Sequence, residues 1–532
     1  MEEKMFNLLD EPWLRVREPD GAVKLVSLLE ALLGAHRFSG LAGELPAQDV
    51  AVMRFLLAVL HTVFTRMDEK GAEREFSLES EAVKQWKTLW EMRYYPEEPI
   101  KRYLEEYRDR FWLFHPARPF GQVPEAAAGT FYTSAKLNGE LSESSNKVRL
   151  FPARTGKGKR EVSMAEAARW ILYLNAFDDT SSKPKGKDLP SPGAGWLGKL
   201  GLIYAEGNNL FETLMLNTVF LKDGKELWAE EEAPEWERKE ARSAERTEIS
   251  RPRNLAQLYT LQSRRILLQR ENEAVTGYHL LGGDFFSPVN AFVEPMTIWA
   301  PVPQKGDTLP EFRPRRHDAG KQMWREFPSL FFTSEGTRLP GIVQWISYLE
   351  DKKLLERDRK LRFRIASVQY GDKDFFVTDV FSDSLSFHRS LLSELGAAWQ
   401  VRIRAELDAC NQAADAVYIL ERDIRRASGG SNVPATAKEQ LYYRLDKPFR
   451  QWLESLNPEQ KEMELEKKCL EWQETVCRVA RQLGKELVEG AGSSAFAGRI
   501  YKEKEKEYYY SAPEAYRWFQ YRINKIYNRK EG

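Results

Sequence analysis

The sequence predicts an α+β protein in two parts: a large mixed domain of helices and β-hairpins over residues 1–383, then a four-helix bundle over residues 384–532. Three observations lead to this prediction. The 532 residues are too many for one hydrophobic core. Extended runs broken by glycine and proline gather between residues 276 and 381, whereas apolar side chains recur at helical spacing through most of residues 384–532.

The first part begins with a predicted β-hairpin. Its strands are Phe6–Val16, interrupted at Pro12, and Val23–Ser27, with a turn at Asp20 and Gly21 between them. Apolar residues at helical spacing then predict helices over Gln48–Met67, Ser77–Tyr107, Met164–Phe177, Leu210–Leu221 and Leu255–Gln269.

Further strands are predicted at residues 276–286, 296–303, 360–370 and 375–381. The last two flank the polar stretch Gly371–Asp374, which is typical of a hairpin tip. In the second part, four helical patterns with short connections favour an antiparallel bundle, over residues 392–424, 435–456, 458–489 and 493–528.

The overall charge excludes a protein that is basic throughout. Lys plus Arg and Asp plus Glu both number 80, so any site for nucleic acid must be local. The only cysteines, Cys410, Cys469 and Cys477, are too few for a disulfide framework or a four-cysteine zinc site. No run approaches the roughly 18 apolar residues of a membrane span. We therefore expect a cytoplasmic protein without a membrane partner.

One glycine-rich and proline-rich stretch, residues 183–201, has no counterpart elsewhere in the chain. Gly193, Ala194 and Gly195 let the backbone approach another molecule closely. Four lysines accompany them, and ammonium groups beside bare main-chain N–H groups suit a polyanion: Lys183, Lys185, Lys187 and Lys199. A surface loop with ordinary turn chemistry explains the same residues, so both interpretations stay open.

A second stretch, residues 147–160, combines six basic residues with no acidic one. Phe151 and two glycines lie among them, as in sites that track a nucleic-acid backbone. The basic residues are Lys147, Arg149, Arg154, Lys157, Lys159 and Arg160. A solvated loop is the alternative. Because only the helix Met164–Phe177 separates this basic loop from the glycine-rich stretch, the two can converge on one ligand.

No convincing catalytic constellation is found. The six histidines are dispersed, and His317-Asp318 is the only His-Asp neighbour pair, which is too few ligands for a divalent-metal site. His61 lies on an apolar helical face and is predicted to be structural. The aromatic stretch Phe111–Gln122 suits either base stacking or an aromatic plug of the core. We predict no enzyme, no catalytic residue, no metal and no cofactor.

Taken in order, these features resemble the CasA large-subunit family of the type I-E CRISPR Cascade complex. The segment Asn7–Val16 is similar to the family's N-terminal signature, and His115–Gln122 is similar to its His-Pro-Phe-x-Gln loop with extra residues. The basic loop, the glycine loop, the β-hairpin and the terminal bundle follow in the family's order. The resemblance implies a non-catalytic subunit that inspects double-stranded DNA for a protospacer-adjacent motif and helps to start unwinding. It also implies as partners the other subunits of a guide-RNA complex and a recruited helicase-nuclease.

The resemblance also implies roles for individual positions. Gly193, Ala194 and Gly195 would lie against the minor groove of the motif, with Lys199 beside them, and Phe151 would anchor near the guide RNA end or the DNA. The wedge that opens the duplex falls on Gly371, Asp372, Lys373 and Asp374, where this sequence has Asp-Lys-Asp in place of the family's frequent Gln. The family's groove lysine has no match within residues 276–286, and its tentative substitutes are Arg315, Arg316 and Lys321.

Two other classes stay open. A helical adaptor that binds only proteins would leave the basic loops as ordinary surface. A metal-dependent nuclease would depend on His317 or Asp318.

Overall fold

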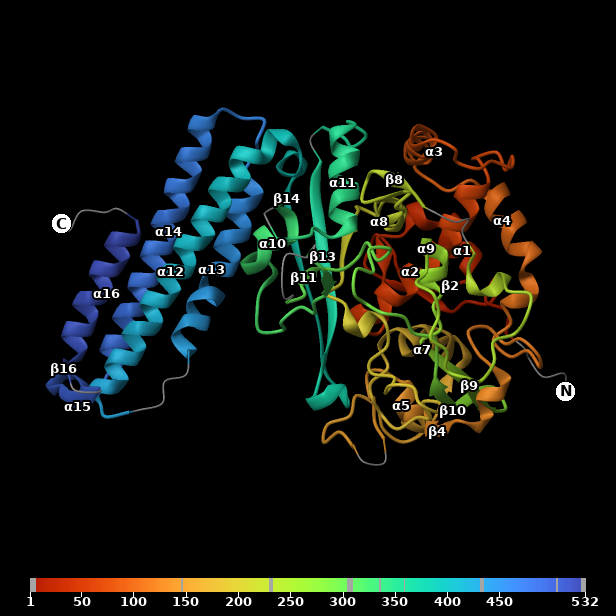
Figure 1. Cartoon of the computed structure of the whole chain (residues 1–532), viewed down its shortest axis with the longest axis horizontal. Helices are drawn as coiled ribbons and strands as arrows, with labels where there is room; N and C mark the ends of the chain where they lie inside the picture. Colours follow the sequence, from red (N-terminus) through yellow and green to blue (C-terminus); the bar gives the residue numbers. More distant parts are fainter. Residues whose placement is uncertain are drawn as a thin grey trace. The chain divides into compact units, whose positions relative to one another are not determined.

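The structure, a computed structural model, describes residues 6–144, 147–228, 233–303, 310–333, 336–357, 359–430, 435–503 and 506–527. The chain divides into two compact units (Figure 1). Unit 1 comprises residues 1–321, 333–354 and 361–384, and unit 2 comprises residues 322–332, 355–360 and 385–532. Helices and strands both contribute, so the predicted mixed class is confirmed.

The core of unit 1 is built around α2 (Pro46–Arg66), in which almost every side chain is buried. It packs against α7 (Met164–Phe177) and α9 (Leu255–Tyr259). By length and composition α2 is apolar enough for a membrane span, and 94% of its most apolar 18-residue window is buried inside the structure. Polar residues such as Arg54 interrupt its apolar ones, so the sequence shows no continuous apolar run of that length; Arg54 is paired with Glu294 at 2.8 Å inside the protein.

The other helices of unit 1 are shorter than α2. They are α1 (Leu28–Leu33), α3 (Glu79–Met92), α4 (Glu97–Glu106), α5 (Ser134–Leu137), α6 (Lys157–Arg160), α8 (Leu210–Asn217) and α11 (Gly341–Asp351). The predicted helix Ser77–Tyr107 is therefore two helices. Arg93 ends α3 in the left-handed region at φ 63°, and Pro96 precedes α4.

The predicted N-terminal hairpin is confirmed, although its first strand is shorter than expected. β1 (Leu14–Arg17) pairs antiparallel with β2 (Val23–Val26) and with β3 (Gly40–Leu41). The short pairs are β7 (Leu221–Lys222) with β8 (Glu226–Leu227) and β11 (Trp299–Pro301) with β12 (Phe312–Pro314).

The prediction of one helix over Leu255–Gln269 was wrong beyond Tyr259. The chain instead forms β9 (Arg264–Glu271), which pairs antiparallel with β10 (Ala274–Gly282). β10 also pairs with β4 (Thr130–Thr133) and β5 (Val162–Ser163). Pairing with a strand satisfies the backbone of β9, and tertiary pairing of this kind overrides local helical spacing.

The predicted long hairpin is confirmed. β13 (Lys360–Tyr370) lies between β14 (Val377–His388) and β6 (Ile203–Glu206) in a three-stranded sheet. The short 3-10 turn Asp372–Asp374 forms its tip. Figure 1 shows the two long strands running side by side to that tip.

Unit 2 contains four long helices that pack on one another: α12 (Ala397–Ala427), α13 (Thr436–Ser455), α14 (Glu462–Glu489) and α16 (Ala512–Ile526). The short helix α10 (Phe327–Phe331) belongs to the same unit. Buried aromatic rings contribute to the core, with Trp452 stacked on Trp472 at 5.4 Å. Cys410, Cys469 and Cys477 are buried, and none of them takes part in a disulfide within the described residues.

The last predicted helix, residues 493–528, was wrong in its first half. The chain forms α15 (Ser493–Ala497), turns at Gly498 with φ +75°, and makes a hairpin of β15 (Arg499–Glu503) and β16 (Lys506–Tyr510) before α16 begins. A glycine at positive φ ends a helix, and a tyrosine-rich run favours a strand.

Candidate nucleic-acid interface

The glycine loop follows α7 and is fixed to its end. Gly195 donates its N–H to the carbonyl of Asp178 at 2.9 Å. A Cβ at Gly195 would lie 2.4 Å from the carbonyl oxygen of Ala176, so no side chain fits there. Ala194 is also buried. The packing of unit 1 itself therefore accounts for these two small residues.

Gly193 differs from its neighbours because its surroundings are open. Its φ is +64°, and a Cβ there would meet only the Cε atom of Lys199, at 3.9 Å. Among the three small residues of the loop, Gly193 is thus the position where another molecule can approach the backbone.

A buried cluster of charged side chains lies beneath this loop. Asp178 pairs with Lys183 at 2.9 Å and with Arg264, and Lys136 pairs with Asp179. Arg264 also donates to the carbonyl of Gly193 at 2.6 Å. Burial alone would raise the pKa of Asp178, but the neighbouring cations lower it to about 2. Lys183, expected to face a polyanion, is therefore an internal ion-pair partner, whereas Lys185 and Lys187 are exposed.

Lys199 lies beside the glycine loop in the 3-10 turn Leu197–Lys199. Burial and the nearby guanidinium groups of Arg264, Arg246 and Arg316 lower the pKa of Lys199 to about 8. Arg246, which sequence reasoning missed, donates to the carbonyl of Pro190 at 2.6 Å and lies over the ring of Phe285. A local excess of positive charge therefore borders Gly193.

The tip of the β13–β14 hairpin is held in an unusual backbone conformation. Lys373 and Asp374 both have positive φ, 53° and 58°. Thr180 donates its N–H to the carbonyl of Asp374 and its hydroxyl to the carbonyl of Lys373, each at 3.0 Å. The side chains of Asp372, Lys373 and Phe375 are exposed there.

The three tentative groove contacts differ in their availability. Arg316 is engaged within the protein, since it binds both carboxylate oxygens of Asp374, at 2.6 and 2.8 Å, and the carbonyl of Gly198. Lys321 is exposed, and its Nζ lies 3.6 Å from the carboxylate of Asp318. Arg315 is partly buried, and its backbone N–H donates to the carbonyl of Ile298.

In the basic loop, three of the six basic side chains are paired with acidic residues outside it. Arg154 pairs with Glu140 and Glu166, Lys159 with Glu143, and Lys157 with Glu161. Arg149 donates to the carbonyl of Leu141. Arg160 is exposed and has no ion pair with any residue that the structure describes. The loop also displays two apolar side chains, with Leu150 90% and Phe151 93% exposed.

The structure brings three of the predicted stretches together. Lys147 of the basic loop donates to the carbonyl of Val377 at 3.1 Å and lies 3.5 Å from the ring centre of Phe376, just after the hairpin tip. Arg316 joins the tip to Gly198 of the glycine-rich stretch. The expected convergence of the basic loop and the glycine loop therefore includes the hairpin tip as well.

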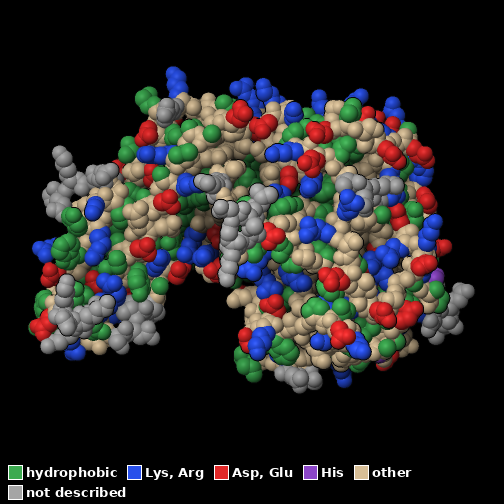
Figure 2. All heavy atoms as spheres, in the orientation of Figure 1, with side chains coloured by type: hydrophobic (Ala, Val, Ile, Leu, Met, Phe, Trp, Pro, Cys, Tyr) green, Lys and Arg blue, Asp and Glu red, His purple; other side chains and the backbone are tan. Residues whose placement is uncertain are grey.

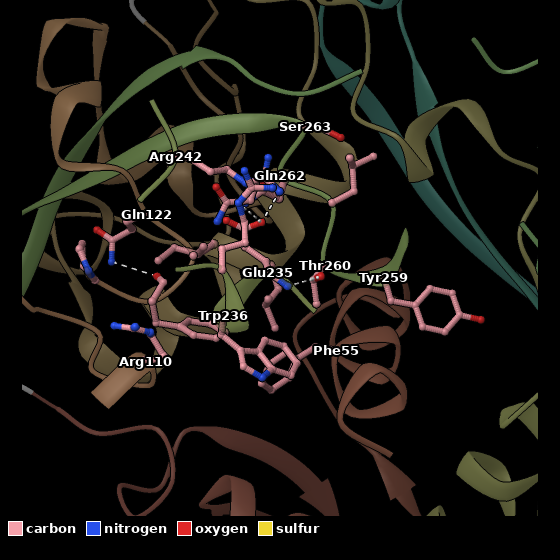
Figure 3. Close-up of a pocket in the computed structure, with 18 of the residues that line it drawn as sticks. Phe55, Arg110, Gln122, Glu235, Trp236, Arg242, Tyr259, Thr260, Gln262 and Ser263 are labelled. Atoms are coloured by element: carbon pink, nitrogen blue, oxygen red, sulfur yellow. Dashed lines mark hydrogen bonds and ion pairs between the residues drawn. The ribbon is translucent and has the colours of Figure 1, made fainter. Parts of the chain in front are cut away.

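A cavity of about 130 Å³ lies against the segment that follows the glycine loop, since Trp196 and Leu197 line it. Phe55, Trp236 and Tyr259 supply aromatic surface (Figure 3). Several of its polar groups already have protein partners: Thr260 accepts from the N–H of Glu235 at 2.9 Å, and Glu235 pairs with Arg242. Ser263 accepts from the N–H of Trp196. The cavity thus backs the loop with a mostly apolar wall.

The predicted structural residues are buried and bonded. His61 accepts from the N–H of Val219 at 3.2 Å, and burial lowers its pKa to about 3. Phe111 and Phe120 are buried and stacked at 5.8 Å, as expected of an aromatic plug. His317 lies 2.9 Å from the carbonyl of Leu202. Within the part of the chain that the structure describes, no three His, Cys, Asp or Glu side chains are grouped to hold a metal ion.

Acidic and basic side chains are interspersed over the visible face of each unit (Figure 2). A large two-unit chain of balanced charge, whose candidate site consists of loops around a hairpin tip, has the form of a binding subunit. Residues 7–483 match the family described as CRISPR-associated protein Cse1. The chain belongs to this Cse1, or CasA, family.

Individual relatives agree with this assignment. The CasA/Cse1 protein of Thermus thermophilus is 34% identical over 237 residues, which cover 44% of this chain and 42% of that protein. The match to this curated relative thus spans less than half of its length. The solved structure of Thermobifida fusca Cse1 is 29% identical, covers 98% of both chains and has a TM-score of 0.83. The Cse1 structure from Acidimicrobium ferrooxidans shares the fold, at 23% identity over 99% of both chains and a TM-score of 0.78.

Proposed function

We propose that this chain is the non-catalytic large subunit of a type I-E CRISPR RNA-guided surveillance complex, acting in the cytoplasm. It recognises the protospacer-adjacent motif in double-stranded DNA, helps to start unwinding and R-loop formation, and recruits the helicase-nuclease. Membership of the Cse1 family supports the assignment to such a complex. The observation that carries the DNA role is Gly193, whose open backbone lies beside Lys199, the neighbour of Gly198, which Arg316 joins to the hairpin tip.

The glycine loop suits minor-groove contact. At Gly193 no side chain separates the backbone from an approaching groove, and the positive charge of Lys199 and Arg246 favours phosphates nearby. The minor groove presents a degenerate pattern of donors and acceptors, so a reader of this kind accepts several related motifs.

The hairpin tip suits strand separation. Asp374 is occupied by Arg316, which leaves Asp372, Lys373 and the 42%-exposed ring of Phe375 as the exposed groups of the tip, and the negative charge of Asp372 is repelled by DNA phosphates. In kinked duplexes the side chains inserted between base pairs are usually apolar. We therefore assign the inserted group to Phe375, and we expect Lys373 to contact the phosphate backbone of the DNA. Guide pairing then reads the target sequence.

The exposed apolar pair of the basic loop suits attachment to the rest of the complex. The side chains of Leu150 and Phe151 are both almost fully exposed to solvent. The ring of Phe151 is the larger of these two apolar surfaces. Contact with a neighbouring subunit or with the guide RNA end would bury both side chains.

The deciding experiment compares the affinity of a guide-loaded complex for target duplexes with and without the motif, for the natural chain and for Gly193→Asp. Bulk and negative charge at residue 193 are expected to remove most of the preference for the motif. Gly21→Asp is the matched control, because Gly21 also has positive φ and open surroundings but lies in the β1–β2 turn. Equal motif preference in Gly193→Asp and the natural chain would reject the glycine-loop assignment.

Omitting the chain altogether tests the wider proposal. If the complex without this chain binds both duplexes as the complete complex does, the chain has no DNA role. A helical adaptor between proteins would then explain the fold better.

A further inference from the structure

A short segment between α7 and the glycine-rich stretch, residues 178–183, is bonded to both halves of the candidate interface. On one side, the carbonyl of Asp178 accepts the N–H of Gly195 at 2.9 Å. On the other, Thr180 donates twice to the hairpin tip, from its N–H to Asp374 and from its hydroxyl to Lys373, each at 3.0 Å. The loop and the tip thus share one support.

This segment is anchored in the core by its own charged residues. The side chains of Asp178, Asp179 and Lys183 are each 1% exposed. Lys183 donates to the carbonyls of Asp179 and Ser181, at 2.7 and 2.8 Å, and Lys136 holds Asp179. A charge pair at this depth is costly to break, so the segment is a rigid base for whatever it supports.

Arg316 makes a second, independent connection between the same two parts. Its Nε donates to the carbonyl of Gly198 at 2.6 Å, and its two terminal nitrogens bind the carboxylate of Asp374. Its guanidinium also lies 4.9 Å from the ring centre of Tyr370, whose hydroxyl donates to the carbonyl of Phe177 at the end of α7. A two-pronged guanidinium–carboxylate contact fixes direction as well as distance.

The tip needs such fixing because its backbone is unfavourable by itself. Lys373 and Asp374 are consecutive non-glycine residues at positive φ, a region that side chains rarely adopt. Such a conformation persists when the surrounding contacts determine it. Thr180 and Arg316 supply those contacts.

We propose that Thr180 and Arg316 are positioning residues that lock the hairpin tip to the glycine loop, so that motif reading and opening of the adjacent base pair are performed by one rigid element. This inference rests on the proposed function. Both residues act through the tip, and neither needs to touch DNA.

The test uses the full chain in the guide-loaded complex with Thr180→Val, Arg316→Gln and the double variant. Opening is followed by the fluorescence of 2-aminopurine placed in the first base pair beside the motif. Motif recognition alone is measured on a duplex that carries the motif but does not pair with the guide. Loss of the Thr180 hydroxyl bond is expected to slow opening about fivefold, the size of one hydrogen bond, and loss of the Arg316 contacts by at least as much. The double variant loses the Thr180 hydroxyl bond and the Arg316 contacts but keeps the bond from the N–H of residue 180 to Asp374, and we expect its opening to be slowed at least tenfold with motif binding unchanged.

Two controls distinguish a positioning role of Thr180 and Arg316 from direct contact of these residues with DNA. Thr180→Ser keeps the hydroxyl donor and is expected to open DNA at the natural rate. A duplex with mismatched, already separated base pairs beside the motif is expected to restore all variants to the natural rate of R-loop formation.

The outcomes are distinct. Natural opening rates in the double variant would overturn the inference, and so would a defect that persists on the mismatched duplex, because Arg316 would then contact DNA directly. A natural chain that shows no motif preference would instead reject the proposed function, and the inference with it.

Discussion

The glycine loop and the basic loop are neighbours around the same hairpin, yet they are built in opposite ways. The glycine loop rests on charged groups that are fully buried, and its cations border an open backbone position. In the basic loop, half of the cations are paired with acids in partly or fully exposed ion pairs, and Leu150 and Phe151 are exposed. A run of basic residues therefore says little about function until its counter-ions are located.

The largest expected difference between the two loops is in how much their ion pairs contribute to the free energy of unfolding. Asp178→Asn is expected to lower the free energy of unfolding by about 3–5 kcal/mol, because it leaves Lys183 and Arg264 buried without a full counter-charge. Arg154→Ala, the control in the basic loop, removes partly exposed ion pairs and is expected to cost about 1 kcal/mol or less. Urea unfolding of the full chain measures both. Similar costs for the two variants would show that both loops rest on equivalent contacts.

The next largest effect is expected from the two exposed apolar residues of the basic loop. Replacing Leu150 and Phe151 by serine leaves the free energy of unfolding almost unchanged, since both side chains are exposed. Their removal is expected to weaken attachment of the chain to the rest of the complex by more than about tenfold, which is typical of a buried aromatic anchor. The affinity is measured by titrating the labelled chain into a guide-loaded complex that was assembled without this chain. Leu25→Ser, at a 44%-exposed leucine of β2, is the control, and equal losses in both would contradict the assignment.

A smaller effect follows from the pKa of Lys199, lowered to about 8. Phosphate binding requires the charged ammonium, so motif-dependent affinity is expected to fall by up to about tenfold as the pH rises from 7 to 9. Lys199→Arg stays charged and is expected to remove most of this dependence. Lys147 also has a pKa lowered to about 8, by burial, so Lys147→Met is the comparison. If Lys147→Met flattens the pH profile and Lys199→Arg does not, the basic loop carries the contact.

The fold could be predicted wherever local pattern and tertiary packing agree. The helix Met164–Phe177 has the predicted bounds, with Ser163 and Glu166 forming a capping box, and the hairpin tip lies where Gly371–Asp374 was expected. β9 could not be predicted, because both arginines at its start are buried through partners elsewhere and hide the alternation of a strand.

The individual loops of the candidate site could be predicted from the sequence, but the ion pairs and hydrogen bonds that join them could not. Small residues and basic runs are visible in a sequence, whereas the pairing of Arg264 with Asp178 or of Arg316 with Asp374 joins residues that are distant along the chain. Thr180 carries no signal of its own, since a threonine after a helix is unremarkable until its hydroxyl is found on Lys373. Arg246 was missed for the same reason.

Gly195 has a consequence for how proteins of this type can diversify. Its lack of a side chain is imposed by the carbonyl of Ala176, 2.4 Å from where a Cβ would be, and not by any DNA partner. Selection for a different motif therefore has little freedom at this position, whatever the target. The exposed tip residues Lys373 and Phe375 are the sites where side chains can vary without loss of the scaffold, whereas Gly193 has open surroundings but a φ of +64°, which disfavours any side chain.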